Sequence, residues 1–315
     1  MITQILFEIP AAYEAAVKTG SLIQIGGLLK NATNGQIVAH LQETGVAHSL
    51  LSTALGGAAS PLNLAAEVTN IGSGIYTAAQ VTQLKSMIAS LQSLQIATLG
   101  VSLVGVGVSV AGFIYMHKRF NSLDERIDKL IGTVHAGFEN QRQAALRAHM
   151  SQVKGLMKLA KQAPTLSRPE GEYGRIAESL SEQASHFEGE LEFLFKTKGK
   201  VSVELFWQLA QVLMLCNSIR IDCRIRTNEL RNAREIAENV ANDYQLLFNQ
   251  LTPVSFQASD SEGAVVVQTI RDITDAAAAK PYLIEFLRTQ RYDGREYLNR
   301  VENETQCPLL MLKAN

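Results

Sequence analysis

The sequence lacks charge over one long stretch. No Asp, Glu, Lys or Arg occurs from Ser86 to Met116, and the wider segment 44–116 contains only Glu67 and Lys85 as fully charged residues. At a rise of about 1.5 Å per residue, a helix over the charge-free run would be longer than the roughly 30 Å hydrocarbon core of a bilayer. The uncharged run therefore predicts a segment that is able to span a membrane.

Cysteine is also scarce, and its spacing is uninformative for metal binding. The three cysteines, Cys216, Cys223 and Cys307, cannot all pair within one chain, and they match no zinc or haem pattern. The N-terminus has no basic leader before its short apolar stretch, so it does not have the form of a secretory signal. We expect a cytoplasmic protein that associates with a membrane conditionally.

Motifs for catalysis and for nucleic-acid binding are missing. The formal net charge of −1 argues against broad electrostatic capture of nucleic acid. Gly105-Val-Gly107 has no third glycine at the spacing of a dinucleotide site, and no phosphate-binding Lys motif occurs. His186 and Glu188 begin like a deaminase signature, but no Pro-Cys-x-x-Cys follows. We expect neither an enzyme nor a cofactor.

Three further groups of polar or thiol residues have an ordinary structural interpretation. Glu182, His186 and Glu190 are spaced by four and predict a solvated helix face. Cys216 and Cys223, seven residues apart, are expected to be packed thiols. A cluster of arginines is interleaved with acidic residues and predicts a salt-bridged exposed face, except that Arg226 could set helix register. The cluster consists of Arg220, Arg224, Arg226, Arg231 and Arg234.

Residues 1–43 predict a small cap that contains strands. The composition of Ile2–Ile9 is typical of a strand, and 10–20 resembles a short helix. Asn34-Gly35 lies between the apolar runs 22–29 and 36–42, which is a strong hairpin signal because both central turn positions need positive φ. The sequence therefore predicts a small α+β cap with a β-hairpin.

Residues 44–116 predict an apolar helical hairpin. Ser60-Pro61 is typical of a helix start, since Ser caps free amides and Pro fits the first helical position. Small and weakly polar residues recur at steps of four and three in the charge-free run and form one stripe of a helix, which suits close helix packing in lipid. The stripe consists of Thr98, Ser102, Gly105, Ser109 and Gly112.

Residues 117–315 predict a long-helix bundle resembling a coiled coil. A helix from His117 should persist to about Gln162, and a second should end near 196–200. Further along, apolar residues alternate at steps of four and three from Leu205 to Leu247, which predicts one helix of roughly 65 to 75 Å and an elongated shape. Shorter helices are expected over 264–279 and 281–301. The predicted rod seam includes Leu205, Leu209, Val212, Cys216, Ile219, Cys223 and Leu230.

This order of parts, from about Thr44 to Leu251, resembles the α-helical pore-forming toxins of the cytolysin A and tripartite haemolysin kind. Those proteins pair a long-helix bundle with an uncharged hairpin that leaves a soluble state to insert. The resemblance involves no residue motif, so no functional residue is carried over. It implies a lipid membrane as partner and assembly with copies of the chain or with related helical subunits.

The function expected from these features is non-enzymatic membrane insertion, either pore-forming or membrane-remodelling. Two alternatives remain open at this point. The chain could be a soluble coiled-coil scaffold or partner-binding subunit in which the hairpin is permanent core. It could also be a constitutive membrane-anchored sensor, with His117-Lys118-Arg119 on the cytoplasmic side of a single span.

Overall fold

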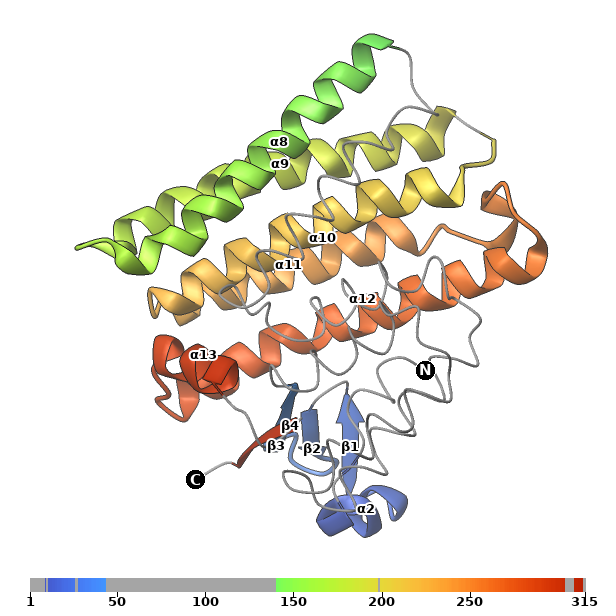
Figure 1. Ribbon diagram of the computed structural model, residues 1–315. Coiled ribbons are helices and arrows are strands. Elements are labelled where there is room, and N and C mark those ends of the chain that lie inside the picture. The colour runs from blue at the N-terminus through green and yellow to red at the C-terminus, as the bar shows by residue number, and fades with distance from the viewer. Residues whose placement is uncertain are drawn as a thin grey trace, which may run out of the picture.

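The computed structural model describes residues 9, 11–25, 28–43, 140–197, 199–303 and 309–313 (Figure 1). The predicted apolar hairpin, with Thr98, Ser102, Gly105, Ser109 and Gly112, lies outside these ranges. The described residues are mainly α-helical and include one small antiparallel sheet, so the prediction of a mainly α chain is confirmed.

The helical part follows the sequence from residue 140 onward. Figure 1 shows α8 to α12 running along a common direction, with α13 at one end. Proline at the first position of α9 and the Ser202 hydroxyl that caps α10 explain where these two helices begin. The elements are α8 (Asn140–Gln162), η2 (Ala163–Thr165), α9 (Pro169–Thr197), α10 (Val203–Arg226), α11 (Leu230–Phe248), η3 (Pro253–Ser255), α12 (Asp260–Thr289) and α13 (Gly294–Asn303).

One apolar core runs through this helical part. Residues of α8 to α13 belong to the same cluster of buried side chains. The seven seam residues are all buried in it, which agrees with their predicted spacing on one face. They are Leu205, Leu209, Val212, Cys216, Ile219, Cys223 and Leu230.

The predicted single helix from Leu205 to Leu247 is wrong. Helix α10 ends at Arg226, and Asn228 adopts a φ of 58°, in the left-handed region. The Asn228 amide donates to Ile225 O at 2.9 Å and the Glu229 amide donates to Arg224 O at 2.9 Å, which is the Schellman pattern of helix termination.

The chain then turns back on itself. Asn217 of α10 donates to the Tyr244 hydroxyl of α11 at 3.0 Å, and the rings of Phe206 and Phe248 lie 6.1 Å apart. The seam therefore continues over two antiparallel helices that bury it against each other. A strict apolar spacing predicts a shared face, but it does not show whether the helix is interrupted.

The C-terminal helices also differ from the prediction. Helix α12 is continuous over Asp260–Thr289 and contains Pro281 in its interior, whereas the sequence predicted a break there. Proline removes one helical hydrogen bond. The alanines before it are strong helix formers, and Leu283 and Ile284 just after it are buried in the core, so packing holds the helix on both sides of the proline.

The sheet contains β1 (Leu22–Ile25), β2 (Leu28–Asn31), β3 (Ile37–Glu43) and β4 (Leu309–Lys313), in that spatial order and all antiparallel. The predicted cap drew its strands from residues 1–43 alone. The C-terminal strand β4 instead pairs with β3, from Ala39 opposite Lys313 to Glu43 opposite Leu309. Strand β3 thus has a neighbour on each side. The expected strand Ile2–Ile9 falls largely outside the described residues.

The predicted hairpin at Asn34-Gly35 is present as β2 and β3, and the expected short helix is α2 (Ala11–Lys18). The turn differs from the expected type, because Gly35 has a positive φ of 71° and Asn34 does not. Asn31 Oδ1 instead accepts from the amides of Thr33 and Asn34 at 2.8 and 3.2 Å. An Asx-type turn therefore supplies the reversal.

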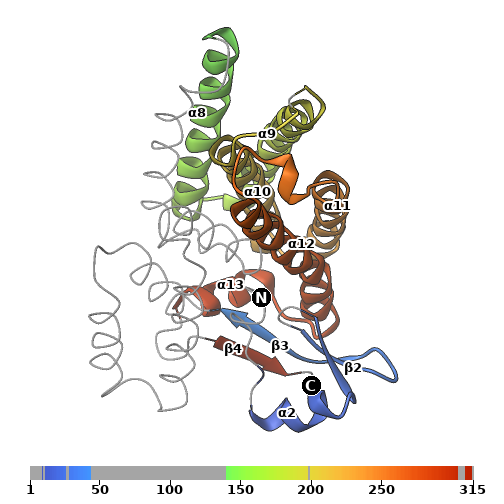
Figure 2. The ribbon, with the colours of Figure 1, turned by 90° about the vertical axis from the view of Figure 1, so that its right-hand side faces the viewer.

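The sheet lies between α2 and α12 in both views (Figures 1 and 2). Leu28, Leu29 and Ala39 are buried, and the Lys30 ammonium lies 5.5 Å from the ring centre of Tyr282 on α12. The sheet is thus held to the helical part through α12.

Candidate functional site

The two ends of segment 44–139, which contains the charge-free run, are attached to different kinds of structure. Residues 44–139 lie between β3, which ends at Glu43, and α8, which begins at Asn140. On the first side, β3 is paired through its main chain with β2 and β4. On the second side, α8 packs against α9 and, to a lesser extent, α10. The contact between α8 and α9 is the candidate functional site.

The apolar part of this contact follows from the sequence pattern of α8. Its buried residues recur at steps of four and three, so they lie on one face. They join the same core as the buried face of α9. The buried apolar residues of that face include Ile176, Leu180, Phe187, Leu191 and Leu194. The buried residues of α8 are Leu146, Met150, Val153, Met157 and Ala160.

Polar side chains interrupt this apolar contact midway. The ring of His149 on α8 stacks on the ring of His186 on α9, with centroids 3.6 Å apart and an interplanar angle of 17°. Gln183 Nε2 donates to Gln152 Oε1 at 2.9 Å, and His149 Nδ1 lies 2.9 Å from Gln183 Oε1. We call His149, Gln152, Gln183 and His186 the histidine cluster.

The hydrogen bonds of the histidine cluster fix one proton. Gln183 uses its amide nitrogen as the donor to Gln152, which leaves its carbonyl oxygen as an acceptor for His149. His149 Nδ1 must therefore carry a hydrogen. Gln183 is only 8% exposed, so this short polar chain is held within the helix contact.

A second polar group lies beside the cluster, between α9, α10 and α11. Arg220 Nη1 donates to the Ser181 hydroxyl at 2.9 Å. Burial raises the pKa of Glu188, and the nearby Asp243 carboxylate raises it further, while Arg220 acts in the opposite direction. Burial likewise raises the pKa of Asp243. These groups are charges held at the edge of the core.

A third group joins α10, α12 and α13 inside the core. Asp222 is fully buried, Lys280 is 5% exposed and Tyr297 is 3% exposed. Burial lowers the pKa of Lys280, and the Asp222 carboxylate opposes that effect. The pKa of Tyr297 is raised by burial and, in second place, by Asp222. We call these three residues the buried charge cluster.

The docking of α13 beside that cluster is tight. A Cβ atom on Gly294 would lie 2.2 Å from Ile225 O, so only glycine fits there. The Gly294 amide donates to Asn228 Oδ1 at 2.9 Å. The first turn of α13 is thereby fixed against the end of α10.

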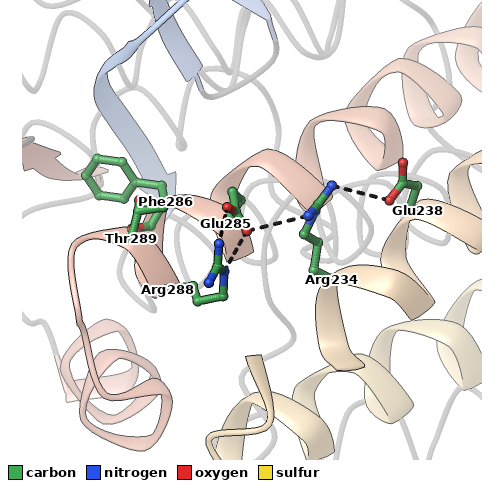
Figure 3. Close-up of polar contacts among 6 residues, drawn as sticks. All are labelled: Arg234, Glu238, Glu285, Phe286, Arg288 and Thr289. Atoms are coloured by element: carbon green, nitrogen blue, oxygen red, sulfur yellow. Dashed lines mark hydrogen bonds and ion pairs between the residues drawn. The ribbon is translucent and has the colours of Figure 1, made fainter. Parts of the chain in front are cut away.

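An exposed ionic network connects α11 with α12 (Figure 3). Glu285 accepts two hydrogen bonds from Arg288, at 2.6 and 2.9 Å, and lies 3.7 Å from Arg234, which also pairs with Glu238 at 3.6 Å. The hydrogen bonds from Arg288 hold the pKa of Glu285 below its usual value, although partial burial acts in the opposite direction.

The structure separates the polar residues that the sequence grouped on α9. Glu182 is exposed, as predicted for a solvated face, and Glu190 is half-buried. His186 instead stacks on His149, a partner on another helix. Sequence reasoning missed His149 because the pattern of one helix carries no information about the helix packed against it.

The arginine cluster is only partly the exposed face that was predicted. Arg234 is paired and largely exposed, in agreement with the prediction. Arg224 pairs with Glu229 at 2.9 Å, but its side chain is only 15% exposed. Asp222, one of the acidic residues interleaved with the arginines, is buried, so the prediction of an exposed face is wrong at this position. Arg226 is also buried, which is consistent with its predicted place on the seam.

The cysteines of the seam are packed thiols, as predicted. Cys216 and Cys223 are free and fully buried, and burial raises the pKa of both thiols well above the ordinary value. Neither is suited to act as a thiolate nucleophile at neutral pH. Cys307 lies outside the described residues.

Across the part of the chain that the structure describes, no helix is long and apolar enough to cross a membrane. No group of three or more potential metal-binding side chains occurs among those same residues. Comparison of the chain with protein-family models, with curated protein sequences and with solved structures finds no match.

Proposed function

We propose that this chain is a non-enzymatic, membrane-inserting helical protein. It converts from a soluble form, oligomerises with copies of itself or related subunits, and inserts the apolar segment 44–116 into a lipid bilayer, which it permeabilises or remodels. The single observation that carries this proposal is the complete absence of charge from Ser86 to Met116, within a segment 44–116 that is itself flanked by sequence of ordinary charge.

The stripe of small residues in that run supports insertion with assembly. Helices in lipid gain little from apolar burial against each other, so they associate through small residues that allow close approach. Gly105 and Gly112 lie on one such stripe, together with three hydroxyl-bearing residues. Assembly of several copies through this stripe would give the hydroxyl groups hydrogen-bond partners inside the bilayer.

The described helices differ from the apolar segment in how their charged residues are distributed, and this difference supports the proposal. They bury an apolar core among α8 to α13 and carry charged residues on their outer faces. The segment 44–139 starts and ends at β3 and α8, so both of its attachments are parts of this helical protein. A folded domain that carries an apolar insert between two attachments suits conversion between soluble and inserted states.

Dye release from liposomes tests the proposal. Wild-type protein is expected to release dye, and Gly105→Glu is expected to abolish most of the release, because an ionised carboxylate in the middle of the stripe opposes insertion. The matched control is Gly189→Glu on α9, where an added side chain meets open space. This control places the same charge outside the segment and should leave release unchanged.

Sedimentation in buffer and with vesicles, together with the thermal unfolding of each variant, separates the alternatives. A wild type that stays soluble with vesicles and releases no dye, while Gly105→Glu unfolds, would instead identify a scaffold with the segment as permanent core. A wild type that always needs detergent would identify a constitutive anchor. Equal leakage from wild type and Gly105→Glu would count against insertion of this segment.

A further inference from the structure

We infer that Asn34, in the turn between β2 and β3, is a site of spontaneous covalent modification. The Gly35 main-chain nitrogen attacks the side-chain amide of Asn34, ammonia leaves, and water opens the resulting succinimide ring to aspartate or isoaspartate. The Lys30 ammonium promotes the attack. The modification needs no membrane and no partner protein, so it goes beyond the proposed function.

The sequence allows unhindered ring closure at this position. Asn34-Gly35 is the only Asn-Gly pair in the chain, and glycine has no side chain to obstruct the approach of its nitrogen to Cγ of the preceding residue. Both residues are exposed, so water, the one co-reactant, reaches the turn. The steric and solvent requirements of the reaction are therefore met.

A hydrogen bond holds the two reacting atoms within one small ring. Asn34 Oδ1 accepts from the Gln36 amide at 3.0 Å, which closes a ring that contains both Asn34 Cγ and Gly35 N. The same bond draws electron density from the side-chain carbonyl and makes Cγ more electrophilic. Asn34 Nδ2, the leaving group, donates to Gln36 Oε1 at 3.3 Å. The side chain is thus held near the peptide that attacks it.

A positive charge lies beside the peptide that becomes negative. A Cβ atom on Gly35 would lie 3.3 Å from Lys30 Cε and 3.8 Å from Lys30 Nζ. The same ammonium lies 5.5 Å from the ring centre of Tyr282. The attacking nitrogen is anionic once it has lost its proton, and the tetrahedral adduct at Cγ carries an oxyanion. A cation next to developing negative charge stabilises the transition state.

One main-chain hydrogen bond opposes the attack. Gly35 N donates to Asn31 O at 3.0 Å, so this bond has to open before the nitrogen loses its proton. Exposed turns open locally without unfolding of the whole protein. The rate of modification therefore depends both on opening of the turn and on the attack that Lys30 assists.

The reaction balances without an oxidant or a reductant. A bond forms between Gly35 N and Asn34 Cγ, the bond from Cγ to Nδ2 breaks, and the amide nitrogen leaves as ammonia with one added proton, equal to the one lost by Gly35 N. Water then cleaves the ring at Cγ to give aspartate or at the main-chain carbon of Asn34 to give isoaspartate. One carboxylate replaces one neutral amide, so the formal net charge of the chain changes from −1 to −2.

Peptide mass spectrometry of the folded, full-length chain measures the conversion. The protein is incubated at neutral and at mildly alkaline pH, and the peptide that contains residues 31–36 is followed over time. At Asn34 an oxygen should replace the NH group, with isoaspartate among the products, and the rate should rise with pH because the attacking nitrogen must lose a proton. Asn31, which is followed by Ala32 in the same peptide, is the internal control and should stay largely unconverted.

Variants of Lys30 separate the effect of its charge from the effect of the Asn-Gly sequence. Lys30→Met should slow the conversion about fivefold, the factor expected for two unit charges roughly 4 Å apart in water, whereas Lys30→Arg should convert at close to the wild-type rate. Added salt should slow the wild type toward the rate of Lys30→Met and leave that variant unchanged. Asn34→Gln, which would need a larger ring, should remain unmodified. Thermal unfolding checks that each variant is folded.

The inference is overturned if Asn34 stays unmodified in the wild type or if Asn31 converts as fast. A wild-type rate in Lys30→Met, together with no response of the wild type to salt, would overturn the role of Lys30. Because the salt measurement uses the wild-type chain, it decides that role even where Lys30→Met is misfolded.

Discussion

The two attachments of segment 44–139 are held by different interactions. On the N-terminal side, β3 is paired by main-chain hydrogen bonds with β2 and β4. On the C-terminal side, α8 is held by side chains alone, through an apolar face and the histidine cluster. Main-chain amides do not titrate in the physiological range, whereas imidazoles do.

The difference indicates which attachment is held more firmly. A central strand leaves its sheet only if hydrogen bonds on both of its edges break together. A helix on one side of a bundle separates when its side-chain contacts weaken. We therefore expect α8 to separate from the helical core more readily than β3 separates from its sheet, and the following changes test that contrast.

The largest expected effect is at the buried charge cluster, which joins α13 to α10 and α12. Lys280→Met leaves the fully buried Asp222 without its opposite charge and should cost about 3–5 kcal/mol of unfolding free energy. Urea unfolding at neutral pH measures it. The double variant with Asp222→Asn should recover much of the loss, and a fully stable Lys280→Met would contradict this role of the cluster.

A somewhat smaller effect is expected on the α8 side. Met150 is fully buried in the contact, so Met150→Ala should cost about 2–5 kcal/mol of unfolding free energy and raise exchange rates first in α8. Leu159→Ala, at a position that is 44% exposed on the same helix, is the control and should change little. An equal rise in the exchange rates of α8 and β3 in Met150→Ala would contradict the expected difference between the two attachments.

The smallest expected effect concerns Glu285, in the exposed network between α11 and α12. Its pKa is lowered by Arg288, so its contribution is present at neutral pH and is lost as the pH falls below about 4.5 toward the folded-state value. Glu285→Gln should cost less than about 1 kcal/mol near pH 7, since the side chain is partly exposed.

Thermal unfolding from neutral to acidic pH measures this difference. The gap between wild type and Glu285→Gln should stay constant through the range in which histidines titrate and close only below it. A gap that closes near about pH 6.5 would contradict a pKa of Glu285 below its usual value.

Much of the helical fold follows from apolar spacing. The predicted ends of two helices, near Gln162 and near 196–200, agree with the ends of α8 and α9. Pro164 and Pro169 restrict the backbone between these two helices, which explains the break after α8. The turn after Arg226 was missed, since Asn228 in the left-handed region leaves almost no trace in an apolar pattern. The helix through Pro281 was missed because tertiary packing overrode a local breaker.

The candidate site was less predictable than the fold. His186 stood out in the sequence, but its partner His149 belongs to a different helix. The two positions are 37 apart in the sequence. The pairing of β4 with β3 was missed for the same reason. Contacts between distant parts of the chain depend on how elements pack, which periodicity along one element does not encode.

The pairing of β3 with β4 has a consequence for synthesis. The ribosome delivers β3 early and β4 only after the whole helical part has been made, so the edge of β3 stays open in the nascent chain. Contacts this distant in sequence form slowly, because a very long loop must close. The last step of folding should thus be the addition of β4, and a chaperone that shields the open edge during translation would raise the yield of folded protein.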